Sequence, residues 1–372
     1  MHRGLVTFTV GAVALAFGTG MTTVHASTAI GTDQIYVSTH GSDSNPCTSA
    51  LPCATLQFAV DNAPAGSLIH VAAGTYNQTV NITEPLTIAG AGAGKTIIDG
   101  SNIDTQAMSP AYFGVISVEN NVGAGGAINI RGLSVRNAYI TTAEYDEDSD
   151  PSDVIVYNDA NAGDTVSISG VALGAVQNAS EFTGIGLDTF NDAASVSFTN
   201  SSVTGVFQGA LLEGGGIGGH VTVTGVNFNH LAACAATTCG AGETFPAEGL
   251  FVLSDQPGTA TDTVNNNRFV GYAGFGVAAD AGYSGGNCAE PNGPCTGNVN
   301  LTANTNTFTL AACADASDGC AAIYLDAAAG NMLSAQLKGD KGTVHSPDFG
   351  IFENPDAGVY SVTEVNDHIK VS

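Results

Sequence analysis

Positive charge is scarce in this chain, and tryptophan is absent from it. Eight lysine and arginine residues stand against 34 aspartate and glutamate residues, and the formal net charge is −26. A surface this acidic repels nucleic acid and anionic membrane faces, so we expect no nucleic-acid partner. It also disfavours a polyanionic glycan as a ligand, unless calcium bridges the two sets of negative charge.

Long apolar runs are missing as well, apart from one near the start. Arg3 precedes an apolar run at residues 10–17, and Val24-His25-Ala26 offers a small-residue cleavage site. This pattern predicts a secretory signal peptide over residues 1–26, because the run is too short to span a bilayer. A residual amphipathic anchor is the alternative. We therefore expect a secreted, extracellular or cell-surface protein with no membrane insertion.

Low charge does not imply disorder here. Hydrophobic residues make up 44% of the chain and charged residues 11%, which leaves enough apolar surface to bury a core. Because no proline-rich or serine-rich linker divides the chain, we expect residues 27–372 to form one domain.

A short apolar stretch that ends in a carboxylate occurs seven times. The segments are 154–159, 184–188, 209–213, 249–255, 274–280, 322–326 and 350–353. Alternating segments that include an asparagine or glycine turn residue precede many of them, at 166–171, 196–200, 221–228, 264–269 and 299–304. A signature that recurs at intervals of about 25–40 residues is typical of a stacked repeat. Each repeat is predicted to run strand, Asn/Gly turn, strand, loop, in one elongated all-β solenoid.

The eight cysteines fall into four close pairs. After a secretory signal, such pairs predict local disulfides that close small loops. Zinc is a weaker reading, because no Cys-x-x-Cys spacing is present. The predicted disulfides are Cys47–Cys53, Cys234–Cys239, Cys288–Cys295 and Cys313–Cys320.

The N-terminal part of the domain begins with a different pattern. Residues 54–63 place Leu56, Phe58, Ala59, Val60 and Ala63 near one helical face, and Pro64 breaks the helix. Short strands follow at 69–71, 79–82, 86–88 and 96–98 between glycine-rich turns.

Residues 54–100, ATLQFAVDNAPAGSLIHVAAGTYNQTVNITEPLTIAGAGAGKTIIDG, resemble the opening of the pectin lyase-like right-handed parallel β-helix superfamily. The resemblance covers 54–100 only. It implies a short helix that caps the first coil, followed by parallel rungs. It also implies that strands of the Gly-Ile-x-Leu type carry the active-site groove on their outer face.

The carboxylates at the ends of the seven segments are the main candidate site residues. Alternation puts them on the outer side of their strands, and neighbouring rungs lie about 4.8 Å apart. Stacked acids are tolerated if they are screened, if one holds a proton beside an ionised partner, or if a cation bridges them. The candidates for an acid and its partner are Asp188 and Glu213 first, then Asp159, Asp255, Asp280 and Asp326.

The resemblance also directs attention to a base, because lyases of this superfamily use an arginine or lysine near calcium. Arg136 is the best placed candidate, and a solvated strand-end arginine is the alternative. The polygalacturonase motifs (Asn-Thr-Asp, Asp-Asp, Gly-His-Gly and Arg-Ile-Lys) are absent, as are the pectinesterase glutamine and paired-aspartate motifs.

A second acidic cluster lies at residues 146–153. Asp146, Asp148, Asp150 and Asp153 alternate in the manner of calcium-loop ligands, but the glycine and distal glutamate of an EF-hand are missing. Calcium is therefore the one cofactor considered, against a plain solvated loop.

Two functions remain open on the sequence. In the first, the protein binds or cleaves an extracellular polysaccharide or cell-surface glycan through an acidic outer face, as a hydrolase or lyase if it is an enzyme. In the second, it is a non-catalytic surface, adhesive or structural protein stabilised by disulfides and calcium.

Overall fold

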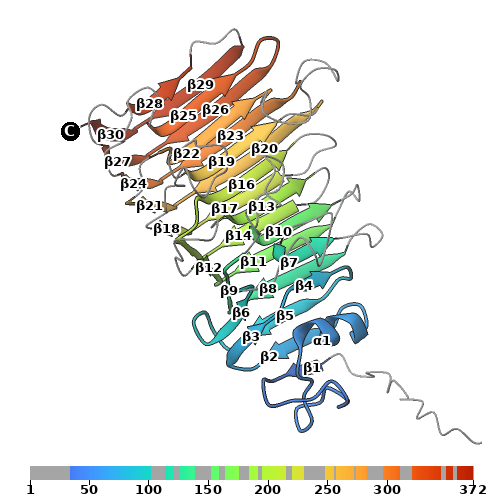
Figure 1. Cartoon of the computed structure of the whole chain (residues 1–372). Coiled ribbons are helices and arrows are strands. Elements are labelled where there is room, and N and C mark those ends of the chain that lie inside the picture. Colours follow the sequence, from blue (N-terminus) through green and yellow to red (C-terminus); the bar gives the residue numbers. More distant parts are fainter. Residues whose placement is uncertain are drawn as a thin grey trace, which may run out of the picture.

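A computed structural model describes residues 34–101, 114–119, 126–138, 152–158, 164–175, 184–191, 195–214, 220–229, 248–254, 257–271, 274–282, 296–310, 321–344, 349–354 and 358–371. These residues form an elongated stack of parallel rungs, with the N-terminal helix at one end (Figure 1). No helix among them is long and apolar enough to cross a membrane. The predicted signal peptide lies outside the described residues.

Three long parallel sheets form the walls of the stack, which we call sheets A, B and C. Sheet A contains β1 (Gln34–Val37), β2 (Leu68–Val71), β5 (Thr87–Gly90), β8 (Ala127–Arg131), β11 (Thr165–Ser169), β14 (Ser195–Thr199), β17 (His220–Thr224), β20 (Thr259–Asn265), β23 (Asn298–Asn304), β26 (Met332–Lys338) and β29 (Val359–Val365).

Sheet B contains β3 (Gly74–Asn77), β6 (Thr96–Asp99), β9 (Ser134–Arg136), β12 (Ala172–Gly174), β15 (Ser202–Thr204), β18 (Asn227–Asn229), β21 (Arg268–Val270), β24 (Thr307–Thr309), β27 (Lys341–Val344) and β30 (His368–Val371). Sheet C contains β4 (Val80–Ile82), β7 (Gly114–Glu119), β10 (Ser152–Asn158), β13 (Ile185–Asn191), β16 (Gln208–Gly214), β19 (Glu248–Ser254), β22 (Val277–Ala281), β25 (Ala321–Ala327) and β28 (Phe349–Glu353). This is the right-handed parallel β-helix that the sequence predicts.

The rung differs from the prediction in one respect, because it has three strands where the sequence indicated two. The strands of sheet B are short, and many place a single apolar residue inside, such as Leu173, Val203 or Phe228. One inward residue produces no visible alternation, so these strands merged with the turns in the sequence pattern.

The predicted Asn/Gly turn is confirmed between sheets A and B. From β8 onward, one residue of each of these turns adopts a positive φ, a conformation that glycine and asparagine accept most readily, and all but Thr305 are glycine or asparagine. The turn residues are Gly132, Gly170, Asn200, Gly225, Asn266, Thr305, Gly339 and Asn366.

The walls of sheets B and C meet along a stack of rings. Phe228, Phe269 and Phe308 stack from rung to rung, with ring centroids 4.8 and 5.2 Å apart. A Cβ atom on Gly249 would lie 2.8 Å from the Phe269 ring and would run into the carbonyl oxygen of Gly276 on the next rung. The glycine therefore allows the C strand to approach the ring stack.

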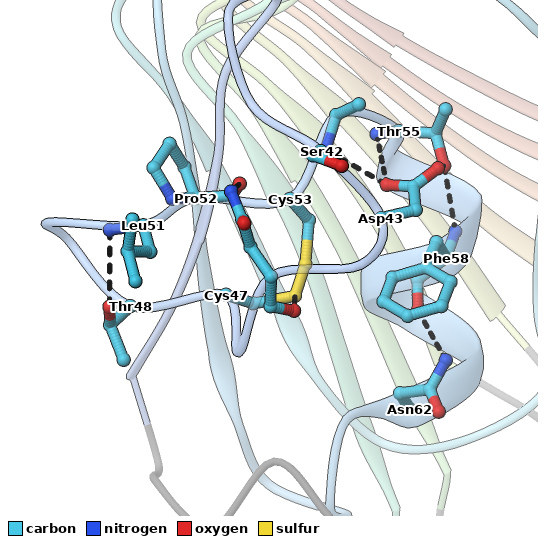
Figure 2. Close-up of a disulfide and its surroundings, with 12 residues drawn as sticks. Ser42, Asp43, Cys47, Thr48, Leu51, Pro52, Cys53, Thr55, Phe58 and Asn62 are labelled. Carbon is cyan, nitrogen blue, oxygen red and sulfur yellow. Dashed lines mark hydrogen bonds between the residues drawn. A yellow bond between two sulfur atoms is a disulfide. The ribbon is translucent and has the colours of Figure 1, made fainter. Parts of the chain in front are cut away.

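The predicted cap closes the N-terminal end. Helix α1 (Leu56–Asn62) buries Leu56, Ala59 and Val60, and the Thr55 hydroxyl accepts a hydrogen bond from the Phe58 amide. Asp43 also accepts hydrogen bonds from the Thr55 amide and hydroxyl (Figure 2). This places the capping helix over the first coil, as the resemblance implied.

The predicted Cys47–Cys53 disulfide is confirmed, and it closes the loop beside this helix (Figure 2). The other three predicted disulfides, Cys234–Cys239, Cys288–Cys295 and Cys313–Cys320, lie outside the described residues.

Replacing Gly249 by alanine is expected to destabilise the protein by about 2–4 kcal/mol, because the new methyl group meets a ring and a carbonyl oxygen. Gly350→Ala is the matched control. Gly350 has the corresponding position in β28, where a Cβ atom would be 3.4 Å from its nearest neighbour. Urea unfolding measures both variants, and equal destabilisation would contradict the packing argument.

Candidate functional site

The carboxylate-ended segments lie on sheet C, where those within the described residues can be compared strand by strand. Asp188, Glu213, Asp280, Asp326 and Glu353 belong to β13, β16, β22, β25 and β28. Asp159 and Asp255 lie outside the described residues. The acids therefore gather on one wall, as the repeat pattern predicted.

Few of the described acids lie opposite another acid on the neighbouring rung, although the repeat pattern suggested that they would all stack. Asp280 pairs with Asp326 on the next rung, so these two carboxylates leave their strands at the same level. Glu213 lies in the same column but pairs with Phe190 and Leu253. Neighbouring acids are thus aligned at one place among the described strands.

Asp188 and Glu213, the preferred pair, are out of register by two residues. Asp188 pairs with Leu211, and it lies inside β13 rather than at the strand end where the sequence placed it. Its side chain is 3% exposed, and the Ser152 hydroxyl donates a hydrogen bond to Asp188 Oδ2 at 3.3 Å. Their Cα atoms are roughly 8 Å apart on standard strand geometry. A catalytic role for this pair stays a prediction.

Arg136 is engaged in an ion pair. Its guanidinium Nη2 lies 2.7 Å from Asp99 Oδ2, and Nε donates to the same oxygen at 2.8 Å. Burial alone would raise the pKa of Asp99, but hydrogen bonds from Ser101, Asn137 and Arg136 outweigh it and hold that pKa at about 2. The pair joins β6 to β9 on sheet B, away from the acid column of sheet C.

The predicted calcium loop is largely outside the described residues, which include Asp153 but not Asp146, Asp148 or Asp150. Asp153 is 1% exposed and accepts hydrogen bonds from the amides of Ala138 and Gly174. Burial raises its pKa well above the ordinary value. Among the described residues no three His, Cys, Asp or Glu side chains gather to hold a metal ion. Calcium stays a prediction.

Half-buried aromatic side chains form a strip on the outer face of the C-terminal part of sheet C. We define the aromatic strip as Phe275, Tyr324 and Phe352. The rings of Phe275 and Tyr324 have centroids 4.6 Å apart, and those of Tyr324 and Phe352 are stacked at 5.4 Å. The strip runs along the axis of the stack because Tyr324 and Phe352 are partners in register.

A polar network borders this strip and converges on Asp326. Asn354 donates to Asp326 Oδ2 at 3.0 Å, and the Tyr360 hydroxyl lies 3.4 Å from Asp326 Oδ1. The Asn354 amide also donates to the Tyr324 hydroxyl at 3.2 Å. The Ala327 amide donates to the Tyr360 hydroxyl, which fixes that phenol beside the carboxylate. Strands β25 and β29 and the residue that follows β28 thus contribute side chains to one polar centre.

The Tyr324 phenol is a neutral hydroxyl near neutral pH. Burial and the nearby carboxylates of Asp326 and Asp280 raise its pKa to about 12. The site therefore offers a neutral hydroxyl, an amide and two carboxylates next to an apolar strip.

Positive charge is kept away from this face. Seven of the eight lysine and arginine residues are described, and each lies on sheet A, on sheet B or in the turns that lead into them. They are Lys95, Arg131, Arg136, Arg268, Lys338, Lys341 and Lys370. The strands of sheet C carry none of them.

Sequence analysis did not identify the group formed by Phe275, Tyr324, Phe352, Asn354 and Tyr360. A register signal was present in the glycines. Glu213 and Asp280 each come four residues after the glycine that packs under the ring stack, Gly209 or Gly276. Aligning the repeats on that glycine, rather than on the acids, places Glu213 and Asp280 at equivalent positions, as their strand pairing does.

Comparisons with known proteins give the fold alone. No protein-family model matches the chain, and no curated protein matches it. Solved structures of similar architecture include a pectin methylesterase from carrot, which is 13% identical, with 91% of this chain and 88% of that chain covered and a TM-score of 0.43.

Two further similar structures are lyases. Pectate lyase Pel9A is 15% identical, with 90% and 78% coverage and a TM-score of 0.47. An alginate lyase from Paenibacillus sp. str. FPU-7 is 15% identical, with 90% and 99% coverage and a TM-score of 0.41. Likeness at this level assigns no activity and no residue role to this chain.

Replacing Asp99 by asparagine is expected to lower the free energy of unfolding by about 2 kcal/mol near neutral pH, because the ionised carboxylate is favoured in the folded state. An acid with a lowered pKa stabilises the fold above its unfolded pKa near 4, and this contribution is lost as the pH falls through about 2. Urea unfolding at neutral and at strongly acidic pH should therefore show the difference only at neutral pH. Glu84→Gln, at an exposed position, is the control.

Proposed function

We propose that the protein is a secreted β-helix protein that binds an extracellular polysaccharide through the aromatic strip and the polar network around Asp326. The observation that carries the proposal is the half-buried strip of Phe275, Tyr324 and Phe352 beside Asp326 and Asn354. Small-molecule sites combine an apolar lining with a few convergent polar groups. Sugars match this combination, since each ring presents C–H faces as well as hydroxyl groups.

Charge supports a neutral or weakly charged glycan over a polyuronate. Asp280 and Asp326 are aligned on neighbouring rungs, and the strands of sheet C carry no lysine or arginine. Carboxylates on a polyuronate would meet like charge with no cationic partner on these strands. Neutral hydroxyl groups can instead donate hydrogen bonds to both carboxylates.

Binding without catalysis suits this geometry, and it includes the adhesive or structural role that the sequence left open. A panel of neutral and uronate polysaccharides, tested by titration calorimetry with calcium and with a chelator, decides between these possibilities. The chelator arm also tests the predicted calcium loop at Asp146, Asp148, Asp150 and Asp153. Failure to bind any glycan would refute the proposal.

Tyr324→Ala and Phe352→Ala are each expected to weaken binding of the best glycan by about tenfold or more, because each removes part of the apolar strip. Tyr36→Ala is the matched control, since Tyr36 stacks on His70 at the other end of the molecule. Equal losses in all three variants would contradict the location of the site.

A second candidate function is glycoside hydrolysis, and the register of Asp280 and Asp326 favours it. Neighbouring rungs place partner residues about 4.8 Å apart, close to the ~5–5.5 Å that separates the two carboxyl groups of retaining glycosidases.

If the protein is a hydrolase, Asp280→Asn and Asp326→Asn should each reduce the release of reducing ends by about a thousandfold, a far larger factor than the accompanying loss of glycan affinity. Glu213→Gln is the control, because Glu213 lies in the same column but next to Leu253 instead of an acid. A loss confined to Glu213→Gln and Asp188→Asn would move the reaction to the pair that the sequence favoured. No turnover by the unchanged protein on any glycan leaves binding as its function.

A further inference from the structure

A ladder of side chains fills the turns between sheets A and B. Its members follow the positive-φ turn residue, one on each rung from β8 onward, and they change from mainly apolar to polar toward the C-terminus. In order they are Leu133, Val171, Ser201, Val226, Asn267, Asn306, Asp340 and Asp367. The last four are linked by hydrogen bonds.

Each polar member accepts a hydrogen bond from the main-chain amide of the ladder residue before it. Val226 donates to Asn267 Oδ1 at 2.9 Å, and Asn267 donates to Asn306 Oδ1 at 3.0 Å. Asn306 donates to Asp340 Oδ1, and Asp340 donates to Asp367 Oδ1, each at 2.7 Å.

The asparagines also donate, which a carboxylate cannot do. The Nδ2 group of Asn267 donates to the Val223 carbonyl at 3.0 Å, and that of Asn306 donates to the Val264 carbonyl at 2.8 Å. Both side chains are buried, so these bonds satisfy polar groups that water does not reach.

Asp340 occupies the next position, where the pattern calls for a donor. Its side chain is fully buried, and Oδ1 receives both the amide and the Nδ2 group of Asn306. Its Oδ2 atom has no hydrogen-bond partner among the described residues. Because Val264 pairs with Ala303, the repeat places the Ala303 carbonyl opposite this oxygen. Two acceptors would face each other there, unless Oδ2 carries a proton.

We propose that Asp340 is protonated in the folded protein, where it takes the part of an asparagine in the ladder, and that its ionisation loosens the last two rungs and weakens the glycan site. Asn354 follows β28 on the rung of Asp340, and Tyr360 lies on β29 of the next rung. Both contact Asp326. The link to glycan binding rests on the proposed function, whereas protonation of Asp340 does not.

The surroundings of Asp340 favour the neutral form. Burial raises its pKa to about 7, and the Asp367 carboxyl on the following rung raises it further, against the lowering effect of hydrogen bonds from Asn306 and from the Lys338 main chain. Asn306 on the preceding rung is neutral, and Lys338 and Lys341 beside it have exposed side chains.

The sign of the pH dependence follows from this raised pKa. The folded state holds a proton that the unfolded chain releases near pH 4. The contribution of Asp340 to stability is therefore fully present below about pH 4 and is lost as the pH rises from there through about 7. Asp262, buried in the lumen, has its pKa raised to about 7 by burial as well, so it titrates over the same window.

Urea unfolding of the full chain from about pH 5 to about pH 8 tests the protonation of Asp340. Asp340→Asn should reduce the number of protons released on unfolding by about one. This corresponds to a tenfold smaller change in the unfolding equilibrium constant per pH unit. It should be more stable than the unchanged protein at pH 8. The control Asp61→Asn removes an exposed carboxylate on α1 and should leave the slope unchanged.

Two further variants keep the test decisive if Asp340→Asn folds poorly. Asn306→Asp should steepen the pH dependence, and Asp367→Asn should shift the loss of stability to lower pH. An unchanged slope in Asp340→Asn or, if that variant does not fold, in both of the others overturns the proposal.

Calorimetric measurement of glycan binding at about pH 5 and about pH 8, with the neutral glycan that binds best, tests whether ionisation of Asp340 weakens the glycan site. The unchanged protein should bind more weakly at pH 8, and Asp340→Asn should bind equally at both. Equal affinities of the unchanged protein at both pH values overturn the link but not the protonation. If no glycan binds at either pH, the proposed function fails with the link, and the unfolding slopes still decide on Asp340.

Discussion

Parallel strands that stack in register about 4.8 Å apart place each side chain against its counterpart on the next rung, and every other feature of this molecule depends on that alignment. It builds the ring stack of Phe228, Phe269 and Phe308, and it aligns Asp280 with Asp326. It also carries hydrogen bonds from Asn267 to Asp367 through the turns. The same geometry stabilises where side chains are alike and apolar, and it creates repulsion where they are alike and charged.

The β-helix could be predicted because its repeats leave local marks. Alternating residues mark the strands of sheet A, and asparagine or glycine marks the turn that follows. The helical cap was visible in the spacing of Leu56, Ala59 and Val60. Apart from the predicted strand at 96–98, sheet B was not visible, since a strand such as β18 has one inward residue, and a single residue shows no periodicity.

The sequence predicted which sheet carries the candidate site but not which residues form it. Parity places an acid on one side of a strand, but it does not say which residue lies opposite on the next rung. The column of Glu213, Asp280 and Asp326 depends on where Gly209, Gly276 and their equivalents pack under the rings. Asp188 follows its own glycine by two residues and therefore lies in a different column. Tyr360 joins the site from sheet A, and no local pattern connects it to Asp326.

The glycines beside the ring stack are required by the rung that follows each of them, not by the rung that precedes it. A side chain at Gly249 would collide with the carbonyl of Gly276, which belongs to the following rung, and Gly209 stands in the same relation to Gly249. What a position tolerates is thus decided by its C-terminal neighbour as well as by its own strand. A rung copied in directly after β16 or β19 would fit because Gly209 and Gly249 are already glycine, whereas Ala322 on β25 shows that the requirement does not extend to that rung. This favours growth of the solenoid by duplication of whole rungs that carry the glycine with them.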